Sequence, residues 1–272
     1  MAAPGVAGAA LLLRQYFMEG WYPSGTKIPS NSFTPSGSLI RAVIMNSGKV
    51  LLGRKEEIYD DDDMTKEVII TNSTEYDEYQ GFGLISLLDA VYLKGKSKGI
   101  VEVFDKQKLD NTEAFQKTFM VGTCEALYTS IMLDYFDVEN TSTSCDPCLV
   151  NRLHLTVVKD GSTYYPNGLT HPDTINNSQR IRIPTEPGGN LTVHVTASKR
   201  NFAPSQKFAL VVSGCIGMPA PHASILFSKR LIVLAILLAF ILFVLYETVS
   251  IYSILRASSL SYDRCFYHNL SI

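Results

Sequence analysis

The chain has 272 residues, of which 46% are hydrophobic and 18% are charged, and its formal net charge is −2 at pH 7. This length allows one large domain or two smaller ones, and the composition is that of a globular chain rather than a disordered one. The charge balance excludes a strongly basic protein, so no nucleic-acid partner is expected.

The first residues, 1–17 (MAAPGVAGAALLLRQYF), predict a helix with a face of small side chains. Pro4 is tolerated in a first helical turn, where its missing N–H breaks no hydrogen bond. A helix with so many small residues allows close packing against other backbone and is normally central and buried. As the first element of a free-standing domain, it would have little to pack against. No basic region follows Met1, so the segment does not resemble a secretory signal.

Residues 18–93 predict mixed loop and helix. A loop rich in Gly, Pro and Ser covers 18–37, and 38–46 (SLIRAVIMN) has apolar residues at helical spacing. Ser47 and Gly48 are a suitable helix stop. An acidic loop covers about 54–80, and 82–93 returns to a compact apolar pattern.

From about residue 99 the pattern predicts β-strands, several of which alternate apolar and polar residues, as in LTVHVTA and KFALVVS. Turn signals such as Asp160-Gly161 and Pro187-Gly188 separate them. The expected strands are 99–104, 115–120, 127–133, 153–159, 180–183, 191–197 and 207–213. Short strands at this spacing predict a β-sandwich over residues 96–214.

Residues 231–255 predict a transmembrane helix after a linker at 215–230, with a short tail at 256–272. The segment begins with the apolar run LIVLAILLAFILFVLY, and Glu247 falls near its C-terminal end. As a helix it would extend about 37 Å, against a hydrocarbon core of about 30 Å. The alternative is a helix buried in a soluble core.

N-glycosylation sequons precede this segment at Asn72, Asn140, Asn176 and Asn190. Basic residues flank the segment almost evenly and set no orientation. The sequons favour a single-pass type I membrane protein with its N-terminal side in the lumen or outside the cell.

Five segments together resemble subtilisin-like serine proteases (subtilases) that carry a C-terminal β-sandwich and a transmembrane anchor. In chain order the segments are MAAPGVAGAALL at the start, PSGSLIRAVIMNSG at 35–48, YQGFGLISLLDAV at 79–91, LVNRLHLTVVKDGSTYYPNG at 149–168 and GGNLTVHVTASKRNFAPSQKFALVVSG at 188–214. The resemblance implies that residues 1–95 complete the α/β catalytic domain. The expected architecture is therefore an α/β remnant, an all-β sandwich and one transmembrane helix.

The resemblance also implies the function of a parent enzyme, which would hydrolyse peptide bonds in protein substrates with a Ser-His-Asp triad. In subtilases the nucleophile would stand immediately before Met1, and the other triad residues lie further upstream. No catalytic residue can therefore be assigned here, and the chain is expected to be an inactive fragment. Calcium is a cofactor that the resemblance implies, although Arg152 and His154 stand where the family has aspartates. The alternative is a non-enzymatic, membrane-tethered sandwich that functions in adhesion or binding.

Three further residue groups have sequence patterns of binding sites. Cys145 and Cys148 have CxxC spacing, but no second ligand pair suggests zinc, so a structural disulfide or reduced surface thiols are expected. An acidic run (Glu56, Glu57 and residues 60–63) lacks the spacing of an EF-hand and is interpreted as a solvated loop rather than a calcium site. His154 and His194 lie in expected strands and are interpreted as surface or packing residues.

Overall fold

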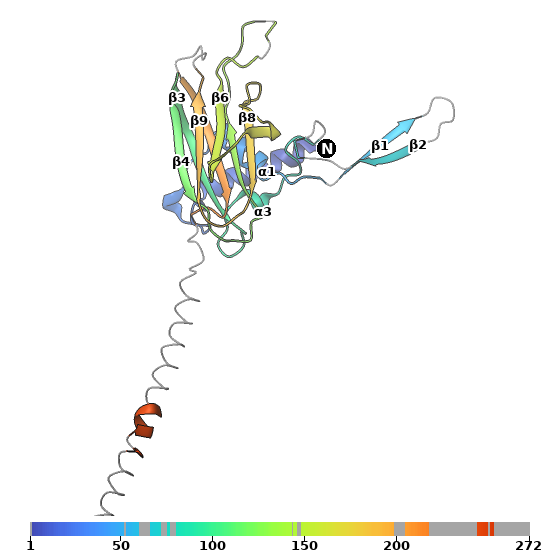
Figure 1. The fold of residues 1–272 in the computed structure, drawn as a ribbon. Coiled ribbons are helices and arrows are strands. Elements are labelled where there is room, and N and C mark those ends of the chain that lie inside the picture. Colours follow the sequence, from blue (N-terminus) through green and yellow to red (C-terminus); the bar gives the residue numbers. More distant parts are fainter. Residues whose placement is uncertain are drawn as a thin grey trace, which may run out of the picture. The chain divides into compact units, whose positions relative to one another are not determined.

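The computed structural model (Figure 1) describes residues 2–51, 53–59, 66–71, 75–76, 80–142, 144–145, 148–198, 205–217, 244–249 and 251–252. Side chains are described for these residues except 54–59 and 66–71. The chain forms two compact units, Met1–Ala220 and Pro221–Ile272.

Two four-stranded antiparallel sheets form the body of the first unit (Figure 1). The first sheet has the order β3 (Ile100–Asp110), β10 (Ser205–Gly214), β5 (Tyr128–Asp134), β8 (Ser178–Pro184). The second sheet has the order β4 (Ala114–Met120), β9 (Asn190–Ala197), β6 (Leu153–Lys159), β7 (Ser162–Tyr164). Every neighbouring pair is antiparallel.

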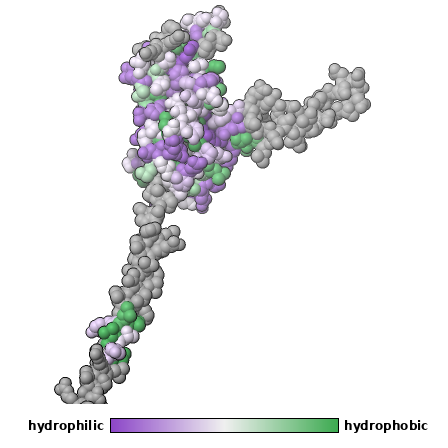
Figure 2. Space-filling model, viewed as in Figure 1, coloured by the Kyte–Doolittle hydropathy of each residue, from purple (hydrophilic) through white to green (hydrophobic). Residues whose placement is uncertain are grey.

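The space between the sheets is filled by alternate side chains of both. Leu155 and Val195 of the second sheet are fully buried, as are Ile131 and Leu210 of the first. The residues that alternate with the buried ones along β6 and β9 point away from this core and are half-buried. Figure 2 shows polar and apolar residues interspersed over the visible face of the unit. The second sheet therefore has one apolar face and one face toward solvent.

The outer face of the first sheet packs against helices instead. The helices are α1 (Ala2–Met18), α2 (Gly37–Asn46) and the short α3 (Leu87–Ala90). α2 contacts β10, β5 and β3, and α1 contacts α2. A second buried cluster joins Leu39 and Val43 of α2 to Ala209 and Val211 of β10. The first sheet is thus covered on both faces.

Local sequence explains where α2 begins. The hydroxyl of Ser36 accepts a hydrogen bond from the Leu39 amide, at 3.1 Å, and caps the first turn. The backbone N–H of Ser36 donates to the Asp105 carboxylate on β3, at 2.9 Å. The same cap therefore starts the helix and ties it to the sheet.

The remaining elements are two 3₁₀ turns, η1 (Pro29–Asn31) and η2 (Pro166–Gly168), and the antiparallel hairpin of β1 (Arg54–Tyr59) and β2 (Lys66–Thr71). In α1 only Ala9, Leu13, Tyr16 and Phe17 are buried, whereas Val6 and Leu11 are exposed. A Cβ at Gly5 or Gly8 would meet no described atom within 4 Å. The N-terminal half of α1 is therefore largely exposed, and its buried residues lie mainly in the C-terminal half.

The predicted fold class, an α/β remnant of a subtilase catalytic domain with a transmembrane helix, is wrong. The structure is mostly antiparallel β-sheet with few helices, and the described part of residues 1–95 contains no parallel strand. The physical reason is that the outer face of the first sheet is itself apolar, so α1 and α2 bury their apolar residues on an antiparallel sheet. The predicted division at residues 95 and 214 stays a prediction.

The predicted transmembrane helix and the single-pass type I membrane localisation are also corrected. No helix among the described residues is long and apolar enough to cross a bilayer. Of the predicted span 231–255, only 244–249 and 251–252 are described, and they are helical.

Candidate functional site

Polar side chains on the helix-covered face of the first sheet form the most developed site in the described residues. Successive strand residues point to opposite faces, so Asp134, Arg180 and Ser213 point toward the helices, while Leu133, Ile181 and Val212 point into the sandwich core. Asp134 and Arg180 are fully buried, so their charges must be satisfied within the protein.

Arg180 of β8 binds the C-terminal end of α2. Its Nη1 donates to the carbonyl oxygens of Met45 and Phe82, each at 2.9 Å, and its Nη2 forms an ion pair with Glu75 Oε1 at 3.0 Å. The guanidinium also lies over the rings of Tyr76 and Phe82, at 4.9 and 5.0 Å from the ring centroids. A cation at a helix C-terminus is favourable because the last carbonyl groups carry partial negative charge.

Arg182, two residues along the same strand, makes a parallel set of contacts. Its Nη2 donates to the Gly48 carbonyl oxygen at 2.7 Å, and its Nη1 pairs with the same Glu75 oxygen at 3.0 Å. Burial lowers the pKa of the Arg182 guanidinium, and the nearby charge of Arg180 lowers it further. The two arginines therefore attach the end of α2 to β8 through one shared carboxylate.

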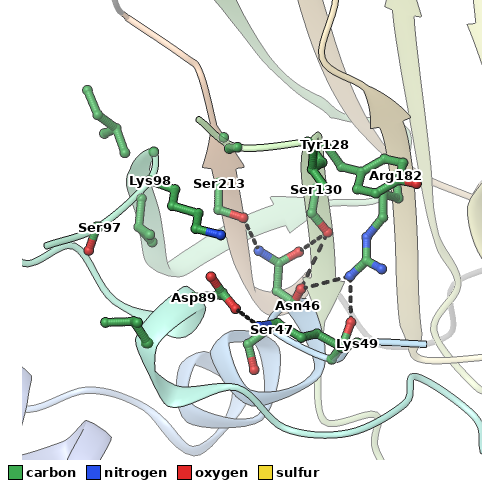
Figure 3. A pocket seen from close by; sticks show the side chains of 18 of the residues that line it. Asn46, Ser47, Lys49, Asp89, Ser97, Lys98, Tyr128, Ser130, Arg182 and Ser213 are labelled. Atoms are coloured by element: carbon green, nitrogen blue, oxygen red, sulfur yellow. Dashed lines mark hydrogen bonds and ion pairs between the residues drawn. The ribbon is translucent and has the colours of Figure 1, made fainter. Parts of the chain in front are cut away.

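Beside this attachment lies a cavity of about 560 Å³. The wall is formed by the end of α2, by α3, by the start of β3 and by neighbouring ends of β5, β8 and β10 (Figure 3). Its lining includes polar, charged and apolar side chains, among them Asn46, Lys49, Leu88, Asp89, Val91, Lys98, Ile100, Val101, Glu125, Tyr128, Ser130, Arg182 and Ser213. Its volume falls within the range of about 300–1,000 Å³ that is usual for small-molecule sites.

Asn46, the last residue of α2, forms part of the cavity lining and is 5% exposed. Its Nδ2 donates to Ser213 Oγ at 2.8 Å, and its Oδ1 accepts from Ser130 Oγ at 2.7 Å. Ser130 and Ser213 face each other on the paired strands β5 and β10. The carboxamide therefore joins helix and sheet and places a hydroxyl group in the cavity wall (Figure 3).

Both signs of charge line the cavity. Lys49 Nζ pairs with Asp89 Oδ2 at 2.6 Å. Burial would raise the pKa of the Asp89 carboxyl, but hydrogen bonds from Lys49 and Ser86 together lower it. In Figure 3 the Lys98 side chain extends toward Ser213 and Asn46. The cavity can therefore accept a ligand with a polar end and an apolar body.

The histidines predicted as surface or packing residues lie on the outer face of the second sheet, away from this cavity. His154 and His194 are on the paired strands β6 and β9. The Nδ1 atom of His154 lies 3.0 Å from the carbonyl oxygen of Asp173. In the described part of the chain, no hydrogen bond joins a histidine ring to a serine hydroxyl, so the structure assembles no Ser-His-Asp triad there.

The four cysteines in the described part of the chain form two disulfides. One joins Cys145 to Cys148 in the loop between β5 and β6, and the other joins Cys124 to Cys215 across a sequence separation of 91. The sequence did not reveal the second pairing, because cysteine spacing alone does not determine which residues meet.

Three of the four predicted glycosylation asparagines are described, and all three are exposed. Asn140 donates from Nδ2 to the Cys148 carbonyl at 3.1 Å, and Asn176 donates from Nδ2 to Asp173 at 2.8 Å. Asn190 begins β9. Asn72 lies outside the described residues, and glycosylation stays a prediction at all four.

The acidic run suggested as an alternative calcium site lies outside the described side chains, since Glu56 and Glu57 are described only as backbone in β1 and 60–63 are not described. Among the residues that the structure does describe, no group of His, Cys, Asp and Glu could hold a metal ion. Calcium therefore remains only an expectation from the resemblance.

Sequence reasoning did not identify the cavity, although one signal was present. Leu39, Val43 and Asn46 lie on one face of α2 at helical spacing, and all three are buried. A carboxamide at a buried helical position requires hydrogen-bond partners, which here are the two serines of the first sheet.

Comparison with known proteins gives distant matches. No protein-family profile matches the chain. "Serine protease/ABC transporter B family protein tagA" of Dictyostelium discoideum is 25% identical over 233 residues, which is 78% of this chain and 12% of that protein. The tagD and tagB proteins with the same description are 42% and 38% identical over 53 residues, which is 20% of this chain and 3% of each relative. The chain thus has distant similarity to proteins named as serine proteases, and it spans a small part of their length.

Among solved structures, a CBM35 from Cellvibrio japonicus Abf62 aligns with 62% of this chain and 93% of its own length. The identity is 16% and the TM-score is 0.17, so the alignment carries no argument about function.

Proposed function

We propose that this chain is a non-catalytic part of a subtilisin-like serine protease, in which it provides a β-sandwich and a helical layer but not the nucleophile. The observation that carries the proposal is the similarity to the tagA protein, which extends over 78% of the chain. The ordered segments that resemble subtilases, from the first helix to KFALVVSG, point to the same group of enzymes.

The chemistry of the described residues agrees with a non-catalytic role. Acyl transfer by a serine requires a base within hydrogen-bonding distance of the hydroxyl and a third group that orients the base. The ring of His154 contacts a backbone carbonyl, and that of His171 lies 3.1 Å from the Pro172 carbonyl oxygen. Cleavage of peptide bonds in protein substrates would belong to the whole enzyme.

A fluorophosphonate probe tests the proposal because it labels activated serines. The purified 272-residue chain is expected to stay unlabelled. An antibody raised against the sandwich is expected to precipitate, from the source cells, a species larger than 30.1 kDa that the probe labels. Pre-treatment with an excess of unlabelled fluorophosphonate is the control, and it should abolish the signal.

Two results would contradict the proposal. Stoichiometric labelling of the purified chain would show that it carries its own nucleophile. An antibody that precipitates only a 30.1 kDa species without reactive serine would show that no protease contains the chain.

A second candidate function, a β-sandwich binding module without enzymatic activity, is favoured by the cavity next to Asn46. It predicts the second of these results, a 30.1 kDa species without reactive serine. The same precipitation therefore separates the two functions.

A further inference from the structure

We propose that the cavity between α2 and the first sheet binds a small aliphatic carboxylate, held by the Lys98 ammonium group and the Ser213 hydroxyl. This inference does not rest on the protease proposal, because every residue that it uses lies within the described part of the first unit. It assigns a ligand class to the cavity from the hydrogen-bond donors, charges and apolar side chains that line it.

The first step is the direction of the hydrogen bonds in the wall. Ser213 Oγ accepts from Asn46 Nδ2 at 2.8 Å, and the described residues offer no acceptor that uses the Ser213 proton. Ser130 donates to the same carboxamide at Oδ1, so its proton is already used. Ser213 is half-buried at the cavity, where its hydroxyl can donate to a ligand oxygen.

The second step is the charge of the wall. Lys49 is paired with Asp89 at 2.6 Å, whereas Arg182 shares the Glu75 carboxylate with Arg180 and donates to the Gly48 carbonyl oxygen at 2.7 Å. Within the described residues, Lys98 Nζ has neither an ion pair nor a hydrogen bond, and its side chain extends toward Ser213 (Figure 3). A cation and a hydroxyl donor directed at one space suit the two oxygens of a carboxylate.

Two acidic groups of the cavity wall oppose this arrangement. Asp89 pairs with Lys49 at 2.6 Å, and the charge of Lys98 also helps to lower the pKa of the Asp89 carboxyl. Glu125 also lines the cavity, is exposed, and makes no ion pair with Lys98 in the described structure. Its charge would repel an anionic ligand, and that repulsion gives a second way to test the site.

The third step is the apolar part of the wall, which is formed by Leu88, Val91, Ile100, Val101 and the ring of Tyr128. Aliphatic side chains of this kind favour an aliphatic ligand body because its burial removes apolar surface from water. A fatty acid of medium length and the C-terminal residue of a short peptide share this chemistry. Octanoate and N-acetyl-leucine represent these two sources.

Isothermal titration of the full chain with each probe at pH 7 tests the proposal. At least one of the two carboxylates should bind saturably, and the one that binds identifies the source. Lys98→Met should weaken that binding by about 10-fold or more, because a charge-assisted hydrogen bond is lost. Lys96→Met is the matched control, since Lys96 is an exposed lysine of the same loop outside the cavity wall. It should leave the affinity unchanged.

Glu125→Gln should strengthen binding of the same probe, because it removes one of the opposing charges. Lys98 is used in preference to Ser213 because Lys98 is exposed and its loss leaves no buried group unpaired. The neutral compounds octanol and N-acetyl-leucinamide should bind more weakly than the acids. Absence of saturable binding by both acids, equal binding of the neutral compounds, or unchanged affinity of Lys98→Met would each overturn the proposal.

Discussion

The two sheets of the sandwich have similar size but different surroundings. The second sheet alternates strictly between buried and half-buried residues along β6, as expected when one face meets water. On the first sheet, β10 is buried on both faces, with Phe208 and Leu210 toward the sandwich core and Ala209 and Val211 toward the helices. The difference shows that a polar residue buried beneath the helices, such as Arg180, depends on partners in the helical layer.

The largest expected effect comes from placing the same cation on the outer face of each sheet. Ala209→Lys puts an ammonium group beneath α2, where it is buried without a partner, and should destabilise the fold by more than about 4 kcal/mol. Thr196→Lys, on the half-buried outer face of β9, should change the free energy of unfolding by less than about 1 kcal/mol. Urea titration followed by circular dichroism measures both, and similar losses for the two variants would show that the helices do not cover the first sheet.

A second pair of variants removes a buried cation from each sheet. Arg180→Met removes one of the two arginine partners of Glu75, leaves the carbonyl oxygens of Met45 and Phe82 without their hydrogen bonds, and should cost about 3–5 kcal/mol. Lys159→Met on β6 should cost about 1 kcal/mol or less, because Asp160 and Glu186, its partners, have side chains 58% and 78% exposed that water can solvate. Denaturant titration at pH 7 gives both values. A smaller cost for Arg180→Met than for Lys159→Met would contradict the role given to the helical layer.

The two disulfides differ in the length of chain that they close. Loss of Cys124–Cys215, with a separation of 91, should cost about 3–5 kcal/mol in paired Cys→Ser variants. Loss of Cys145–Cys148, with a separation of 3, should cost only about 1–2 kcal/mol. Thermal unfolding of the two double variants under non-reducing conditions compares them, and the reverse order would exclude loop closure as the source of the stabilisation.

The last expected effect is a pH dependence that belongs to the covered face of the first sheet. Burial raises the pKa of Asp134 to about 6, although the Ser178 hydroxyl and the charge of Arg41 act against the increase. The folded state therefore binds the proton more tightly than the unfolded state, in which the pKa is about 3.9. The resulting stabilisation is complete below about pH 3.9 and is lost as the pH rises through 6, by up to about 3 kcal/mol.

Asp134→Asn removes this titration. The free energy of unfolding of the unmodified chain, relative to that of the variant, should fall between pH 4 and pH 8. Urea titrations at several pH values measure the difference, with Asp160→Asn as the control, because Asp160 is exposed beside the second sheet. A difference that stays constant with pH would show that Asp134 does not titrate in this range.

Much of the sandwich could be predicted from alternation alone. The expected strand 153–159 coincides with β6, and those expected at 115–120, 127–133, 180–183, 191–197 and 207–213 match β4, β5, β8, β9 and β10 to within two residues at each end. The strand expected at 99–104 covers only the first half of β3, and β7 was not expected. The expected helix 38–46 differs from α2 by one residue. Apolar residues at every second position predict a strand, and apolar residues at helical spacing predict a helix, because the spacing shows which side of the element faces the core.

The alternation of apolar and polar residues does not specify whether water or another element covers the face of a strand that points away from the sandwich core. In RIRI at 180–183, the arginines alternate with isoleucines as they would on a strand that faces water, yet Arg180 is fully buried beneath the end of α2. The small residues of α1 suggested burial, yet its first half is exposed. The cavity beside Asn46 combines residues from α2, β5 and β10 that are distant in sequence, so no local pattern could identify it.

The shared carboxylate of Glu75 has a consequence for how the protein loses its structure. Two guanidinium groups converge on one acid, so about half of their positive charge is balanced by the carbonyl groups that end α2. Lifting the helix off β8 would break the hydrogen bonds from Arg180 to the Met45 carbonyl and from Arg182 to the Gly48 carbonyl. The helical layer and the sandwich are therefore expected to melt together, in a single transition rather than in two steps.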